Sequence, residues 1–194
     1  STSLRTRRPG AAQGRAGAVL LLAGAVLAFG GSLRAADRIE GPRYVAFASD
    51  RPGGAGEWDT YLYDRQERGL VALPGLNGSS REIHPSISGD AEAIFFTSNR
   101  PADKPASVLM YDRKAGALAD LPGLNADATS ALPSVTAGGR RLAFTRIVYN
   151  TASRDKPNPS HVLIYDREKS AFVTPSALNA PGSQHKFGAI SGDG

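Results

Sequence analysis

The sequence predicts an all-β fold made of tandem repeats, and two observations carry that prediction. The tripeptide Tyr-Asp-Arg occurs three times, beginning at Tyr63, Tyr111 and Tyr165, so that successive copies lie 48 and then 54 residues apart. Beyond residue 42 the apolar runs are short and rich in β-forming residues, and no segment shows helical periodicity. Repeats of this length are typical of solenoids, propellers and other arrays of supersecondary units.

Each repeat contains four short runs with the character of strands. Apolar side chains fall on both alternating faces of these runs, so we expect the strands to be covered on both sides. The expected strands are 43–49, 92–98 and 140–145 for the first kind of run, 59–64, 107–112 and 161–166 for the second, 70–74, 118–122 and 171–174 for the third, and 84–88, 132–136 and 186–191 for the fourth.

A recurrent aspartate is expected to hold one of the turns between strands. In Asp112-Arg-Lys-Ala-Gly116 the carboxylate can accept backbone N–H bonds while the glycine takes a left-handed backbone conformation. Asp64 with Gly69 predicts the same arrangement, and the third copy has Asp166 followed by a serine instead of the glycine. We therefore interpret these aspartates as turn-stabilising residues rather than as ligands of Ca²⁺.

Four antiparallel strands per repeat fit one blade of a β-propeller, in which radial packing covers both faces of each small sheet. The motifs resemble those of TolB-like propeller repeats, relatives of the WD repeats. They stand here as Pro85-Ser-Ile-Ser-Gly-Asp90, Val45-Ala-Phe-Ala-Ser49 and Tyr63-Asp64, and the resemblance covers residues 42–194. The family's usual tryptophan before the serine is absent, and an isoleucine or valine stands there in all three copies.

This resemblance implies a partial β-propeller of four-stranded antiparallel blades, with about two whole blades and two partial ones. In TolB-like repeats the proline-containing strand is the innermost of a blade, which would give whole blades at about 84–122 and 133–174. The chain does not begin with Met and stops within a repeat, so we expect an N-terminal fragment truncated at its C-terminus. We accordingly predict two parts, a leader at 1–36 and propeller repeats at 37–194.

The leader has the three-part layout of a secretory signal peptide. A basic stretch from Arg5 to Arg15 precedes an apolar run from Ala16 to Phe29, and small residues follow. The apolar run falls short of the roughly 20 residues that a membrane span needs. We therefore expect export to the periplasm or secretion, with an uncleaved N-terminal anchor as the alternative and twin-arginine export, from Arg7-Arg8, as a further one.

The charge distribution argues against nucleic-acid binding. The formal net charge is +5, but residues 1–36 hold five arginines and no acidic residue, so residues 37–194 are neutral. A surface that follows a phosphate backbone needs clustered Lys and Arg, and the repeats show no such cluster. The chain has no cysteine, which excludes a disulfide framework within this segment.

Two sets of connections are long, and in a four-stranded meander both fall at the same end of each sheet. We call this end the long-connection face and the opposite end the short-turn face. Binding residues tend to lie on loops held by a rigid scaffold, so the long-connection face is the candidate binding surface. The long connections are 50–58, 99–106 and 146–160 in one set and 75–83, 123–131 and 175–185 in the other.

The candidate binding residues on this face are Arg51, Trp58, Arg81, Arg100 and Arg146. The arginines could form a ring that faces an anionic partner or a glycan, and the alternative is that each braces its own loop. Trp58 could stack on a sugar or a peptide, and the alternative is packing at a strand edge.

The motif search finds no catalytic site. The sequence lacks a Gly-x-Ser-x-Gly elbow, a glycine-rich phosphate loop, a His-Glu-x-x-His helix and a cysteine nucleophile. His84, His161 and His185 stand at different repeat positions, with no spacing typical of a metal site. The sequence therefore predicts no catalytic residue, no metal and no cofactor.

The function that the sequence favours is an exported, non-enzymatic propeller that binds protein partners at the bacterial cell envelope, as its resemblance to TolB-like periplasmic proteins implies. Two alternatives stay open because fold does not decide function. The repeats also resemble propellers that precede a serine-peptidase domain of the prolyl-oligopeptidase type, with the catalytic domain outside this segment. A glycan-binding propeller is the second alternative.

Overall fold

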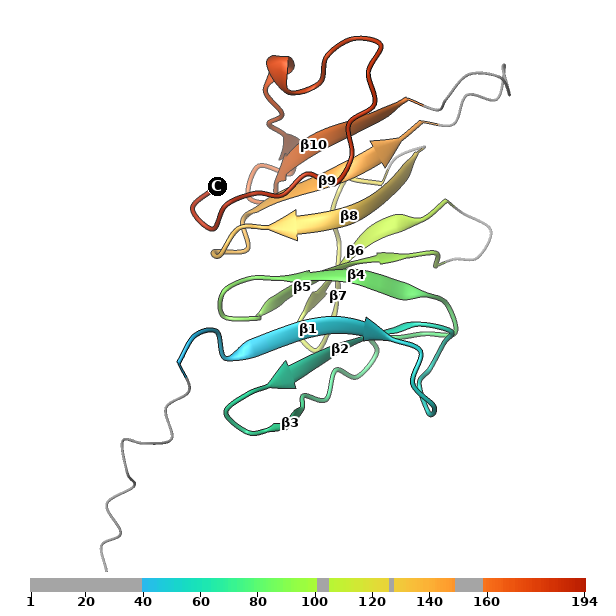
Figure 1. Cartoon of the computed structure of the whole chain (residues 1–194), viewed down its shortest axis with the longest axis vertical. Coiled ribbons are helices and arrows are strands. Elements are labelled where there is room, and N and C mark those ends of the chain that lie inside the picture. The colour runs from blue at the N-terminus through green and yellow to red at the C-terminus, as the bar shows by residue number, and fades with distance from the viewer. Residues whose placement is uncertain (1–39, 101–104, 126–127, 149–158) are drawn as a thin grey trace, which may run out of the picture. The chain divides into compact units, whose positions relative to one another are not determined.

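The computed structural model describes residues 40–100, 105–125, 128–148 and 159–194 (Figure 1). The predicted leader lies outside the described residues, as do parts of three long connections. Apart from a single turn of 3₁₀ helix over Ser176–Leu178, the described elements are all strands. They form three antiparallel sheets, and in each sheet strands that follow one another in sequence are neighbours. The predicted all-β partial propeller is confirmed.

The three sheets are three successive blades. Blade 1 contains β1 (Tyr44–Ser49), β2 (Asp59–Asp64) and β3 (Gly69–Leu70). Blade 2 contains β4 (Glu82–Ile87), β5 (Ala93–Ser98), β6 (Ser107–Asp112) and β7 (Ala117–Ala119). Blade 3 contains β8 (Thr129–Val135), β9 (Arg141–Ile147), β10 (Ser160–Asp166) and β11 (Ala171–Phe172). Most bounds match the expected strands to within a few residues, and β3, β7 and β11 are shorter than expected.

Two hydrophobic cores lie between the blades. One contains Leu62 from β2 with Ile94 and Phe96 from β5, and the other contains Phe95 from β5 with Phe144 from β9. All six residues of β5 are buried, because alternate side chains enter opposite cores. The expectation that strands are covered on both sides is therefore confirmed for this strand. Each fully buried Phe, Leu or Ile contributes about 1.5–3 kcal/mol relative to an exposed one.

An asparagine follows a leucine at the same position of each repeat, at Asn77, Asn125 and Asn179, and it fastens each long connection to its own blade. The side-chain amide of Asn125 accepts the N–H of Val108 at 3.0 Å and donates to the C=O of the same residue at 2.8 Å. Asn77 makes the same two bonds with Thr60, and Asn179 with Val162. The pairing of β7 with β6 ends where Ala119 faces Met110. The amide of Asn125 therefore forms hydrogen bonds with a part of β6 that β7 does not reach.

The aspartate turns form as predicted, but their left-handed residue corrects one prediction. Asp64 accepts the N–H groups of Gln66 at 2.9 Å and Glu67 at 3.2 Å, Asp166 accepts the equivalent pair, and Asp112 accepts the N–H of Ala115. The residue with positive φ is the fourth after each aspartate, which is Arg68, Gly116 or Ser170. The expectation that Gly69 takes this conformation is wrong, because the turn closes one residue earlier.

The inner strands share a bulge that the sequence did not predict. Its central residue has positive φ, 53° at His84 in β4 and 58° at Leu132 in β8, and Phe187, at the corresponding repeat position outside the described strands, has φ 59°. The bulge turns the N–H of Leu132 toward the preceding blade, where Thr97 Oγ1 accepts it at 3.0 Å. Residues in this region of backbone space store about 1–3 kcal/mol of strain each, and the hydrogen bond helps to hold the distorted backbone.

The prediction of a strand at 186–191 is wrong, because this segment forms no strand. The segment follows the path of an inner strand and makes single bonds to blade 3, such as the N–H of Ile190 to Ser134 Oγ at 3.1 Å. The described residues include no strand that pairs with it, so no ladder of hydrogen bonds forms. Gly188 packs closely against β10. A Cβ added at this position would lie only 2.4 Å from Val162 Cγ1, so a larger residue would clash.

Candidate binding face

The strand register places the long connections at one end of each blade. Ser49 faces Asp59, Ser98 faces Ser107, and Ile147 faces Ser160, so each pair marks the end at which a long connection leaves the sheet. The inner strands β4 and β8 begin at the same end, because Glu82 faces Ser98 in blade 2 and Thr129 faces Ile147 in blade 3.

Trp58 and Arg81 lie side by side at this end. They form an isolated bridge, and the C=O of Trp58 accepts the N–H of Glu82 at 2.7 Å. Trp58 is 38% exposed, and the side chain of Arg81 is 49% exposed. Arg81 Nε is 3.8 Å from the carboxylate of Glu57, an exposed ion pair that contributes little energy. The two side chains are therefore accessible while their backbone is fixed.

A small pocket lies beside Arg81. It has a volume of about 120 Å³ and is lined by Arg81, Ile83, Thr97, Asn99 and Ala106. Asn99 Oδ1 accepts the backbone N–H of Arg81 at 2.8 Å, which ties the pocket wall to the loop. Pockets for drug-sized ligands hold about 300–1,000 Å³, so this one suits a single side chain or another small group.

Arg51 is held against aromatic rings of blade 1. Its guanidinium carbon lies 4.2 Å from the ring centre of Tyr61 and 5.1 Å from that of Phe47, and the two rings stack on each other at 5.7 Å. Such cation–π contacts contribute about 0.5–1 kcal/mol at exposed sites. Partial burial, together with the Asp59 carboxylate, raises the pKa of the Tyr61 hydroxyl.

Arg100 and Arg146 reach into the preceding blade. Each donates through Nη2 to a loop carbonyl, that of Leu76 for Arg100 and that of Leu124 for Arg146. Burial lowers the pKa of Arg146. The structure thus brings Trp58 and Arg81 together, holds Arg51 on its own blade, and places these two arginines between blades.

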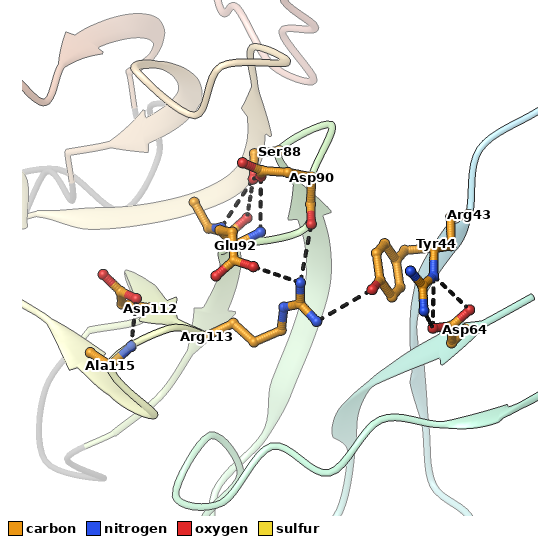
Figure 2. A network of polar contacts seen from close by, with 10 residues as sticks. Arg43, Tyr44, Asp64, Ser88, Asp90, Glu92, Asp112, Arg113 and Ala115 are labelled. Atoms are coloured by element: carbon orange, nitrogen blue, oxygen red, sulfur yellow. Dashed lines mark hydrogen bonds and ion pairs between the residues drawn. The ribbon is translucent and has the colours of Figure 1, made fainter. Parts of the chain in front are cut away.

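Sequence reasoning missed a second cluster, on the short-turn face between blades 1 and 2 (Figure 2). In blades 1 and 3 the turn aspartate pairs with an arginine, Arg43 with Asp64 at 2.6 Å and Arg140 with Asp166 at 3.0 Å. In blade 2, Glu92 stands at the position of these arginines. The sequence signal for this cluster is that a glutamate in the second repeat replaces the arginine of the first and third repeats.

Glu92 pairs instead with Arg113, at 2.7 Å. The guanidinium of Arg113 lies 4.9 Å from the ring centre of Tyr44 in blade 1 (Figure 2). A pocket of about 170 Å³ lies beside this cluster, and its charged lining residues are Asp90, Glu92, Asp112, Lys114 and Arg167. Acidic and basic groups are mixed in it, so it favours no single charge of ligand.

Within the described ranges, no three His, Cys, Asp or Glu side chains are grouped closely enough to hold a metal ion. The part of the chain that the structure describes contains no helix long and apolar enough to cross a membrane.

The four-stranded meanders and their face-to-face packing define the chain as part of a β-propeller. Solved structures of similar fold include a putative TolB from Agrobacterium tumefaciens, with 17% identity, TM-score 0.49, and coverage of 67% of this chain and 44% of that one. TolB from Acinetobacter baumannii has 20% identity, TM-score 0.44, and coverage of 69% and 30%. Oligogalacturonate lyase from Vibrio parahaemolyticus has 15% identity, TM-score 0.47, and coverage of 67% and 35%.

The chain spans less than half the length of each of these proteins. No protein-family model matches the sequence, and no curated protein matches it significantly. The likeness therefore concerns the fold, which hosts unrelated functions.

Proposed function

We propose that this chain belongs to an exported, non-enzymatic β-propeller that binds a protein partner at the bacterial cell envelope, in the manner of TolB-like proteins. The single observation that carries the proposal is the exposed pair of Trp58 and Arg81 on the long-connection face. The signal-like layout of residues 1–36 supports export.

The chemistry of this pair suits a protein interface. Tryptophan and arginine are enriched among the residues that dominate binding energy, and they act best beside pockets that exclude water. Here Arg81 lines a pocket of about 120 Å³, and Trp58 is bridged to Arg81 through the backbone. Their backbone is fixed by bonds to Glu82 and Asn99, so little ordering cost would arise on binding.

Affinity capture from envelope extracts, with paired variants, tests the proposal. A partner that the wild-type chain retains should be lost with Trp58→Ala and with Arg81→Ala. It should be kept with Lys114→Ala, which removes an exposed side chain on the short-turn face. Equal retention by all three variants would contradict a role for the long-connection face. N-terminal sequencing of the exported protein tests cleavage near residue 36.

The two alternative functions give different outcomes in the same experiments. A glycan-binding propeller would retain polysaccharide through Trp58, and the retained material would resist protease treatment. A propeller that gates a prolyl-oligopeptidase-type peptidase would be encoded in one reading frame with a hydrolase domain containing Gly-x-Ser-x-Gly. Sequencing of the coding region beyond Gly194 distinguishes that case.

A further inference from the structure

Blade 2 holds a buried carboxylate at the start of its inner strand. Glu82 is fully buried, and one carboxylate oxygen accepts a bond from Ser98 Oγ at 3.0 Å and lies 3.2 Å from Arg100 Nε. The other oxygen accepts the backbone N–H of Gly78 at 3.0 Å. The same arginine donates to the C=O of Leu76 in the preceding blade. The buried charges are thus paired and hydrogen-bonded, as stability requires.

Blade 3 has an arginine that makes the same kind of bond to the preceding blade, but it lacks the carboxylate. The register pairs Glu82 with Ser98 in blade 2 and Ser130 with Arg146 in blade 3, so Ser130 stands at the position of the glutamate. Arg146 comes from the position of Ser98. It nevertheless donates to the C=O of Leu124, the counterpart of the carbonyl that accepts the arginine bond in blade 2.

Two buried polar atoms are left without partners. Ser130 is fully buried, and its Oγ and Arg146 Nε have no hydrogen-bond partner among the described residues. Residues that face each other in an antiparallel ladder project to the same side of the sheet, so both side chains lie on one side of blade 3. A serine ends one atom beyond Cβ and cannot reach the place that the carboxylate of Glu82 fills in blade 2.

The charge of Arg146 determines which kind of ligand could bond to these two atoms. The guanidinium carbon lies 4.7 Å from the ring centre of Phe172 and 5.7 Å from that of Phe144, so aromatic rings cover it. No carboxylate of the described residues lies within ion-pair distance of Arg146. Among the described residues no acidic group offsets this partly buried charge, which favours an anion as its partner, and a water molecule would supply hydrogen bonds but no opposite charge.

We propose that Arg146 and Ser130 form a binding site for a small monovalent anion, a halide or a carboxylate, at the blade-3 counterpart of the Glu82 carboxylate. The anion accepts hydrogen bonds from Arg146 Nε and Ser130 Oγ. Because Arg146 is also bonded to Leu124, the bound anion stabilises the contact between blades 2 and 3. This site lies at the same end of the blades as the proposed protein-binding pair but does not involve Trp58 or Arg81.

Thermal unfolding of the full chain tests the site. Sodium chloride and sodium formate would each replace sodium gluconate at constant ionic strength, since gluconate is too bulky for a buried site. At ten times the dissociation constant a single-site ligand should raise Tm by about 3–6 °C for a chain of this size. A saturable rise with chloride or formate supports the proposal. A Tm that responds to neither anion overturns it.

Three variants make the test specific. Ser130→Glu should supply the missing carboxylate and abolish the anion response, with a Tm in gluconate at least equal to that of the wild type in saturating anion. Gln66→Glu adds the same charge at an exposed turn and should keep the response. Arg146→Met keeps an apolar stem against the rings and should lose the response even if Ser130→Glu fails to fold. A response that persists in Arg146→Met overturns the proposal.

Discussion

At the scale of the residue, single polar side chains replace backbone partners that the short strands do not provide. Asn125 gives both hydrogen bonds that the backbone of Val108 would otherwise obtain from a longer β7. The sequence showed that this asparagine recurs, but it could not show its partner, because the two residues lie 17 positions apart. Only the fold brings the amide against the start of β6.

Asn125→Ala should destabilise the chain by about 1–2 kcal/mol, because it leaves a backbone N–H and C=O of Val108 unsatisfied. Urea unfolding measures this change through the shift of the midpoint at constant m-value. Gln66→Ala, at an exposed turn position, serves as the control and should lie within about 0.5 kcal/mol of the wild type. A loss below that limit for Asn125→Ala would show that the amide bonds do not contribute.

The Asp166 carboxylate should make the stability of blade 3 depend on pH in the acidic range. The hydrogen bond from Arg140, assisted by the N–H groups of Lys169 and Glu168, holds the pKa of this carboxyl below its ordinary value of 3.8. A group whose pKa is lower in the folded state stabilises the protein above its unfolded pKa, and this stabilisation is lost as the pH falls through the folded value.

Asp166→Asn should therefore reduce stability at neutral pH and flatten the fall of Tm as the pH drops below about 4. A series of unfolding curves between neutral pH and the acid limit of folding measures this. Asp120→Asn, at an exposed position, should leave the wild-type profile unchanged. Parallel profiles for wild type and Asp166→Asn would contradict the assignment.

At the scale of the element, the strands were predictable and the distortions within them were not. Runs such as 92–98 carry apolar side chains on both faces, and β5 is accordingly buried throughout. The bulge at Leu132 and the absence of a strand at 186–191 depend on contacts with other blades. Arg146 lies at the long-connection end, where the sequence placed it, but its bond to Leu124 crosses a blade interface and could not be read from the repeat.

Arg68→Gly should stabilise the chain by about 0.5–1 kcal/mol, because glycine adopts the left-handed conformation that this position requires without a steric cost. Arg68 has φ 54° and is exposed, so few contacts are lost. Gly116 takes the same position in blade 2 with φ 68°, and Gly116→Ala should destabilise by a similar amount. Thermal unfolding of both variants checks the pair. Shifts in the same direction would contradict the assigned turn geometry.

At the scale of the whole molecule, the blades are joined by the same bonds at successive interfaces. Tyr111 Oη donates to the C=O of Pro74 at 3.1 Å, and Tyr165 Oη donates to the C=O of Pro122 at 2.9 Å. These bonds and the two hydrophobic cores fix the blades against one another. The long-connection face therefore rests on a rigid base, as the proposed preorganised contact through Trp58 and Arg81 requires.

The most direct test of the central claim is site-specific photo-crosslinking in cells that export the protein. A photoreactive amino acid would be placed at position 58 on the long-connection face, and at position 114 on the short-turn face as the matched control. We expect a discrete protein adduct in the envelope fraction from position 58 and none from position 114. Adducts of equal yield from both positions, or none from position 58, would contradict it.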